Sequence, residues 1–126
     1  MAACATGTPL IKNVWADNMA KAIVIFVTAS STDEARKIGQ TLVEEGRVAC
    51  CNIVQSVESI FKWEGKLQVE REVLMICKMR EDLFDTVEKR IKQLHSYQVP
   101  EIIAVPITQG SKGYLDWVTK ETETLQ

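Results

Sequence analysis

The chain has 126 residues, of which 46% are hydrophobic and 25% charged, values that exclude disordered, collagen-like and membrane-spanning proteins. Its length is that of a single domain, because domains cluster near roughly 100–150 residues. Fifteen basic and seventeen acidic residues give a net charge of −2, which does not favour binding to nucleic acid. The one histidine, His95, excludes a metal site that needs several imidazoles from one chain.

The cysteines predict a reducing compartment. Four are too few for a disulfide-rich scaffold, and the neighbours Cys50 and Cys51 would point to opposite faces of a strand. The first twenty residues contain no apolar core like that of a signal peptide, and no stretch approaches the roughly 18 apolar residues of a membrane span. We therefore expect a cytoplasmic protein that does not associate with membranes.

The first strand is expected directly after an extension without periodicity. Residues 1–21 are predicted to be a flexible N-terminal extension, and residues 22–126 the folded domain. Residues 22–27 are continuously apolar and branched, which is typical of a strand covered on both faces. Ser31 and Glu34 then have the spacing of a capping box and predict the start of a helix. Its apolar face would contain Ala35, Ile38, Leu42 and Val43.

A long hairpin is predicted next. Residues 48–61 and 67–79 have the composition of strands, and Gly65 provides a turn between them. The tip of this hairpin would carry Phe61 and Trp63. The order continues with a second helix over about 81–94, a strand over 102–107 and a closing helix after Gly113. The β-α-β-β-α-β order with a terminal helix predicts an α+β, ferredoxin-like sandwich.

A ferredoxin-like sheet carries its helices on one face and leaves the other face uncovered. The strands predicted here are apolar, and aromatic side chains lie at the hairpin tip. Exposed apolar faces and strand edges promote association. The sequence therefore predicts self-association that covers the open face.

Four motifs, in the same order along the chain, resemble the CutA family of divalent-cation tolerance proteins. They lie within roughly residues 23–122 and comprise Val48-Ala49-Cys50-Cys51-Asn52-Ile53, Ser59-Ile60-Phe61-Lys62-Trp63-Glu64-Gly65-Lys66, His95-Ser96-Tyr97-Gln98-Val99-Pro100-Glu101-Ile102 and Tyr114-Leu115-Asp116-Trp117. The resemblance implies a homotrimer similar to the PII signalling proteins and tolerance of copper and other divalent metals. It implies neither an enzyme activity nor an organic cofactor.

The chain departs from the family pattern at several positions. Ser30 and Ser96 stand where prolines are usual, and Cys51 replaces a common valine. Val27 and Leu94 occupy positions where some bacterial members carry a cysteine and a second histidine. These candidate ligands are therefore missing from this sequence.

His95, Tyr97 and Glu101 are the first candidate site, since an imidazole, a phenol and a carboxylate fall within one predicted loop. They would bind a metal ion or a small ligand. In the alternative, His95 caps the second helix, and Tyr97 and Glu101 bond across a subunit contact. Cys50 offers a soft ligand suited to copper, although free cysteines are usually buried and inert.

Four further residues are assigned to the trimer interface and its cleft. Phe61 and Trp63 would anchor the interface rather than stack on a ligand, since aromatic anchors dominate interfaces. Glu72 and Lys78 would form an ion pair or line a pocket between subunits, because charged groups within an apolar strand need partners.

The function predicted from the sequence is therefore that of a homotrimeric divalent-cation tolerance or response protein. It would bind copper, another divalent metal or a small ligand at clefts between subunits. The alternative is a trimeric PII-like signalling or interaction scaffold that displays its loops to a protein partner and has no physiological metal site. We expect no enzyme activity in either case.

Overall fold

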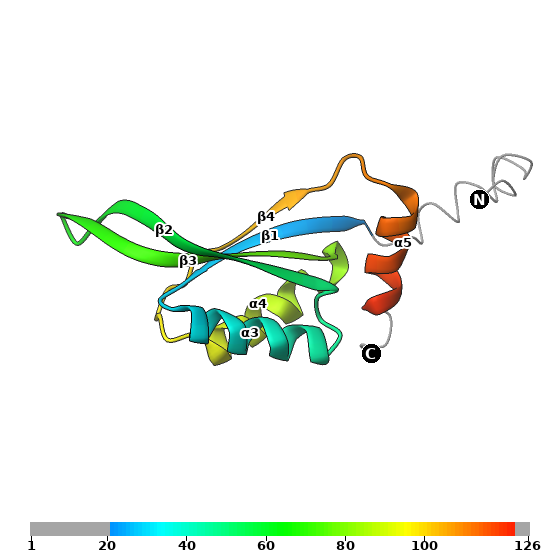
Figure 1. Ribbon diagram of the computed structural model, residues 1–126, viewed down its shortest axis with the longest axis horizontal. Helices are drawn as coiled ribbons and strands as arrows, with labels where there is room; N and C mark the ends of the chain where they lie inside the picture. Colours follow the sequence, from blue (N-terminus) through cyan, green and yellow to red (C-terminus); the bar gives the residue numbers. More distant parts are fainter. Residues whose placement is uncertain (1–20, 123–126) are drawn as a thin grey trace, which may run out of the picture.

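A computed structural model describes residues 21–122 (Figure 1), so the predicted N-terminal extension, apart from Lys21, lies outside the described residues. The elements are β1 (Ala22–Ala29), α3 (Thr32–Glu44), β2 (Cys50–Trp63), β3 (Lys66–Arg80), the 3₁₀ helix η1 (Glu81–Leu83), α4 (Phe84–Leu94), β4 (Ile102–Pro106) and α5 (Lys112–Glu121). The strands form one antiparallel sheet in the order β2-β3-β1-β4. The predicted α+β, ferredoxin-like fold is confirmed.

The sheet separates a helix-covered face from an open face. Figure 1 shows α3 and α4 on the same side of the sheet, and α5 near the ends of β1 and β3. Alternate residues of β1 and of the second half of β3 enter the core with α3 and α4, as the two-residue period of a strand requires. The fully buried core side chains include Ile25, Val27, Ile38, Leu42, Met75, Cys77, Met79, Val87 and Ile91.

The first helix begins where its capping residues predicted. The Ser31 hydroxyl accepts a 3.1 Å hydrogen bond from the Glu34 N–H. The Glu34 carboxylate turns back and accepts from the N–H and hydroxyl of Ser30, at 3.0 and 2.8 Å. Glu34 therefore also holds in place the loop that follows β1.

The β2–β3 hairpin extends well beyond the helices (Figure 1). Its tip pairs Trp63 with Lys66, and Glu64 and Gly65 between them have φ angles of 50° and 80°. Two successive positive φ angles define a type I′ turn, whose twist matches that of the strands. Farther back, Ser56 has a φ of 64° where the pairing register shifts. The bulge leaves the two halves of β2 in different registers against β3.

The second helix differs from its prediction at its start. Residues 81–83 form η1, and the α-helix begins at Phe84. No side chain caps the first residue of η1 or of α4. After β3 the chain first makes the tighter 3₁₀ turn, and the α-helical hydrogen bonds begin only after it. The effect is local, and α4 still ends at Leu94, as predicted.

Candidate functional site

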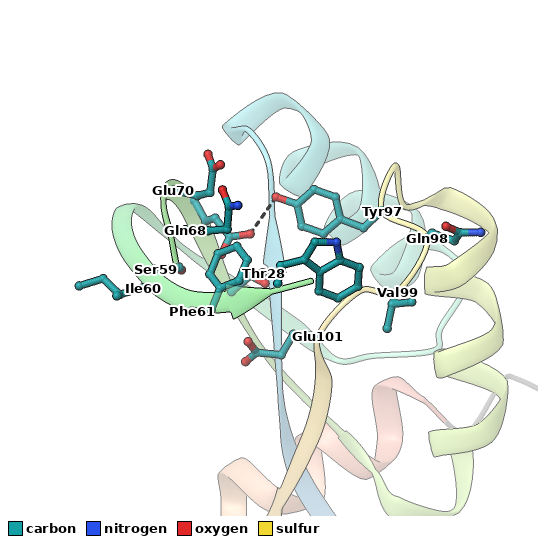
Figure 2. Close-up of a pocket in the computed structure, with 12 residues that line it drawn as sticks. Thr28, Ser59, Ile60, Phe61, Gln68, Glu70, Tyr97, Gln98, Val99 and Glu101 are labelled. Atoms are coloured by element: carbon teal, nitrogen blue, oxygen red, sulfur yellow. Dashed lines mark hydrogen bonds between the residues drawn. The ribbon is translucent and has the colours of Figure 1, made fainter. Parts of the chain in front are cut away.

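A cavity of about 740 Å³ lies between the outer half of the hairpin and the loop that joins α4 to β4. Figure 2 shows the side chains around it, drawn from the hairpin, from the end of β1 and from the loop. They are Thr28, Ser59, Ile60, Phe61, Trp63, Gln68, Glu70, Glu72, Tyr97, Gln98, Val99 and Glu101. The cavity therefore combines exposed aromatic side chains with three carboxylates.

One hydrogen bond joins the loop to the hairpin. The Tyr97 hydroxyl donates to the Glu72 carboxylate at 2.8 Å, shown as the dashed line in Figure 2. Glu72 is only 8% exposed. Partial burial raises the pKa of the Tyr97 phenol, and the bond to Glu72 and nearby carboxylate charges raise it further. The phenol therefore stays protonated and acts as a donor.

His95 lies beneath the cavity wall with its side chain fully buried. Its Nδ1 accepts a 3.0 Å hydrogen bond from the Tyr97 N–H, and its Nε2 lies 2.7 Å from the Thr28 carbonyl oxygen. Because the N–H of Tyr97 needs an unprotonated acceptor, Nε2 carries the hydrogen and donates to Thr28. Both ring nitrogens are thus engaged, and the imidazole orients the loop rather than facing the cavity.

Glu34 supports the same loop from the other side. Its carboxylate accepts a 2.6 Å bond from the Ser96 N–H as well as the two bonds from Ser30. Burial raises the pKa of the carboxyl, but the bonds from Ser96 and Ser30 outweigh it and lower the pKa to about 2. Glu34 therefore joins the loop after β1 to the loop after α4 as an anion.

The structure brings together five of the eight residues predicted for the site and its cleft. Tyr97, Glu101, Glu72, Phe61 and Trp63 line the cavity, while His95 supports it from below.

Cys50 and Lys78 lie elsewhere, opposite each other near the base of the hairpin. Lys78 lies about 20 Å along β3 from Glu72, so the two do not pair. Instead the Lys78 ammonium donates to the Asn52 side-chain oxygen, and the Cys50 thiol lies 3.8 Å from the same atom. The part of the site predicted from Cys50 is therefore spatially separate from the cavity.

Several cavity residues were missed from the sequence. Gln68 and Glu70 were not predicted, yet they alternate with the predicted Glu72 along β3, and all three line the cavity. The two-residue period that defines a strand face would have grouped them. Glu34 was recognised as a capping residue, but its contact with Ser96 depends on tertiary packing that local spacing does not reveal.

The described residues, 21–122, contain no group of three or more histidine, cysteine, aspartate or glutamate side chains placed to hold a metal ion. The carboxylates of the cavity are therefore not assembled into a complete ligand set by these residues alone. Over the same residues, no helix is both long and apolar enough to cross a lipid bilayer.

The sheet order, the long hairpin and the cavity at its side define an α+β protein of the ferredoxin-like class. Residues 23–121 match the family described as CutA1 divalent ion tolerance protein. The chain belongs to this family.

Individual relatives agree with this assignment. The chain is 41% identical over 100 residues to "Protein CutA, chloroplastic" of Arabidopsis thaliana, covering 79% of this chain and 55% of that protein, so it spans about half of that relative. A solved divalent cation tolerance protein of Thermus thermophilus has a TM-score of 0.79 and 40% identity, covering 80% of this chain and 98% of that one. The structure described as a periplasmic CutA of Archaeoglobus fulgidus has a TM-score of 0.78 and 40% identity, covering 80% of this chain and 98% of that one.

Proposed function

We propose that the protein is a homotrimeric, non-catalytic divalent-cation tolerance protein of the cytoplasm that binds a divalent metal ion at clefts between subunits. Copper is the first metal to test, as the family resemblance implies. The observation that carries the proposal is the cavity with Glu70, Glu72 and Glu101 on its wall, bordered by exposed aromatic side chains.

Support for self-association comes from the open face of the sheet. Val54, Ile103 and Val105 are 42%, 53% and 46% exposed. Ile103 and Val105 pair with Phe26 and Val24 of β1, whose side chains point away from α3 and α4. Exposed apolar residues gathered on one face of a sheet are typical of an interaction surface. A second and third copy of the chain would cover it and bring further side chains to the cavity.

Support for a metal site in a cleft comes from the incomplete ligand set. Carboxylate oxygens bind divalent cations, and the described residues of one chain supply no group of three ligands in suitable positions. Groups from a neighbouring subunit would complete the coordination. The soft thiol of Cys50, on the separate part of the hairpin, would provide a different copper site.

The hydrogen bonds around the cavity support binding rather than catalysis. Both ring nitrogens of His95 are engaged, and the raised pKa of Tyr97 keeps its proton on the phenol. A general base needs a free site for the proton that it accepts. Neither group offers one, so the site is suited to holding a ligand.

The second candidate is a trimeric PII-like signalling or interaction scaffold. Its support is the hairpin tip, where Trp63 and Phe61 are 53% and 39% exposed and Leu67 is 71% exposed. Exposed aromatic side chains are typical anchors for a protein partner. On this proposal the cavity has no physiological metal ion.

Calorimetric titration of the full chain with Cu²⁺, and separately with Zn²⁺ and Mg²⁺, distinguishes the two candidates. We expect Glu72→Gln and Glu101→Gln to weaken binding about tenfold or more, since each removes an anionic ligand. The matched control is Glu58→Gln, an exposed carboxylate of the same hairpin that does not line the cavity. Equal affinity in all four proteins would exclude the cavity as the metal site, and no heat with any metal would favour the scaffold.

A further inference from the structure

Two cysteines oppose each other within the hairpin, in a region separate from the cavity. Cys51 of β2 is the register partner of Cys77 of β3. Directly opposed residues of antiparallel strands have Cβ atoms about 4.5–5.5 Å apart on the same face of the sheet. A disulfide requires Cβ atoms about 3.5–4.5 Å apart, so a small closure of the strands would bridge this pair.

The two thiols differ in their access to solvent. Cys77 is fully buried in the core, whereas Cys51 is partly exposed. A cavity of about 510 Å³ between α3 and the edge strand β2 is lined by Cys51 but not by Cys77. Its other lining residues are Arg36, Gly39, Gln40, Val43, Glu44 and Ile53. A small solute can therefore reach one sulfur of the pair from the surface.

Helix α3 packs closely against the Cys51 sulfur at Gly39. A Cβ atom at Gly39 would lie 3.0 Å from the Cys51 Sγ, closer than a side chain normally tolerates. The missing side chain at Gly39 lets α3 pack directly on Cys51. The Cys51 sulfur therefore packs against α3 on one side, and on the other side it lies next to Cys77 of the neighbouring strand, on the same face of the sheet.

The electrostatics distinguish the two thiols in the same way. The neighbouring Cys77 thiol lowers the pKa of Cys51 against the raising effect of burial, and the charge of Lys78 lowers it further. The neighbouring Cys51 thiol and burial raise the pKa of Cys77 far above its usual range. The thiolate therefore forms on the accessible sulfur, which is the arrangement of an attacking and a resolving cysteine.

We propose that Cys51 and Cys77 form a peroxide-sensitive dithiol, in which Cys51 is oxidised through the cavity beside α3 and Cys77 resolves it to an intramolecular disulfide. This function concerns a different site from the cavity at the hairpin tip. It does not depend on metal binding.

The chemistry balances with hydrogen peroxide as the oxidant. The Cys51 thiolate attacks one peroxide oxygen, so that an S–O bond forms, the O–O bond breaks and hydroxide leaves as water after taking up a proton. Cys51 is then a sulfenic acid. The Cys77 sulfur attacks the Cys51 sulfur, the S–S bond forms and the S–O bond breaks. The hydroxyl leaves as water with the Cys77 proton, and a thiol reductant restores the pair.

The test treats the folded full chain with hydrogen peroxide, alkylates the remaining thiols and maps the peptides by mass spectrometry. Cys4, which lies outside the described residues, is replaced by serine in every protein. We expect one disulfide, between Cys51 and Cys77, in each chain. Cys51→Ser should slow the loss of the Cys77 thiol about tenfold or more, since it removes the accessible thiolate with which Cys77 reacts.

Two further variants identify the roles of the cysteines. Cys77→Val keeps the core apolar and should stop the reaction at a Cys51 sulfenic acid, which dimedone traps. Cys50→Ser is the matched control, because Cys50 neighbours Cys51 but points to the opposite face, and it should leave the disulfide unchanged. Oxidation of Cys50 before Cys51, only intermolecular disulfides, or thiols that survive excess peroxide would each overturn the proposal. Mapping the disulfides of the protein that carries only Cys4→Ser decides whether Cys51 and Cys77 pair, even if Cys77→Val does not fold.

Discussion

The Tyr97 hydroxyl and the Glu72 carboxylate, 2.8 Å apart, join the loop after α4 to the hairpin across the cavity. Next to this bond, Nδ1 of His95 accepts a hydrogen bond from the Tyr97 N–H, and Nε2 of His95 donates one to the Thr28 carbonyl oxygen. A chain of hydrogen bonds thus runs from β1 through the imidazole and the loop to β3. Its geometry holds one wall of the cavity in place against the other.

Removing the Tyr97 hydroxyl tests this connection. We expect Tyr97→Phe to lower the free energy of unfolding by about 1–2 kcal/mol, since the nearly buried Glu72 carboxylate loses a donor. Urea unfolding measures the change. Tyr114→Phe is the matched control, because Tyr114 is 41% exposed, and its effect should be within a few tenths of a kcal/mol. An equal loss in both variants would show that the bond contributes nothing specific.

Replacing His95 distinguishes a supporting residue from a metal ligand. His95→Ala leaves the Thr28 carbonyl and the Tyr97 N–H without their partner and opens a void in the core, so we expect a loss of about 2–4 kcal/mol. The measurement is urea unfolding without metal, followed by calorimetry with Cu²⁺. Unchanged stability combined with abolished metal binding would instead assign His95 as a ligand.

The Glu34 carboxylate makes stability depend on acid pH. Its pKa lies near 2 in the folded chain against an ordinary 4.5, so its contribution is fully present above pH 4.5 and is lost as the pH falls toward 2. Between pH 4.5 and 2 we expect the free energy of unfolding of Glu34→Gln to fall by roughly 1 kcal/mol less than that of the wild type, after allowing for solvent screening. Urea unfolding at several pH values from 2 to 6 measures it. Parallel curves for both proteins would contradict the assignment.

The fold could be predicted because its signals are local. The apolar run of β1, the capping spacing of Ser31 and Glu34 and the turn at Gly65 each depend on neighbours in the sequence. Their order was enough to specify the ferredoxin-like class. The start of α4 was less predictable, because no capping side chain marks it.

The sequence predicts the site only in part, because residues that are close in sequence need not point into the same space. His95, Tyr97 and Glu101 share one loop, yet the His95 ring points inward to the Thr28 carbonyl. Cys50 was grouped with them by chemistry, although the strand register places it at the other end of the hairpin. The pairing of Cys51 with Cys77 also depends on that register, which a sequence without a known bulge position does not specify.

Two glycines, Gly65 at the hairpin tip and Gly113 in α5, test how the backbone conformation limits substitution. We expect Gly65→Ala to cost about 1 kcal/mol, because its φ of +80° strains a residue with a side chain although no atom lies within 4 Å of the added methyl. Gly113→Ala also meets no atom within 4 Å, but it lies in α5 and should be neutral or stabilise by up to about 0.5 kcal/mol. Thermal unfolding of both variants measures the contrast. A stabilising Gly65→Ala would contradict the type I′ turn.

The proposed trimer is tested by a matched pair of valines. Val105, 46% exposed on the open face of β4, and Val43, 42% exposed on α3, differ in the face of the sheet that they occupy. We expect Val105→Lys to weaken association roughly a hundredfold, because a lysine ammonium buried between subunits without a partner loses its hydration. Val43→Lys should leave the assembly intact, since α3 lies on the opposite side of the sheet. Sedimentation equilibrium measures the particle mass of both, and a trimer that survives Val105→Lys but not Val43→Lys would place the interface on the helical face instead.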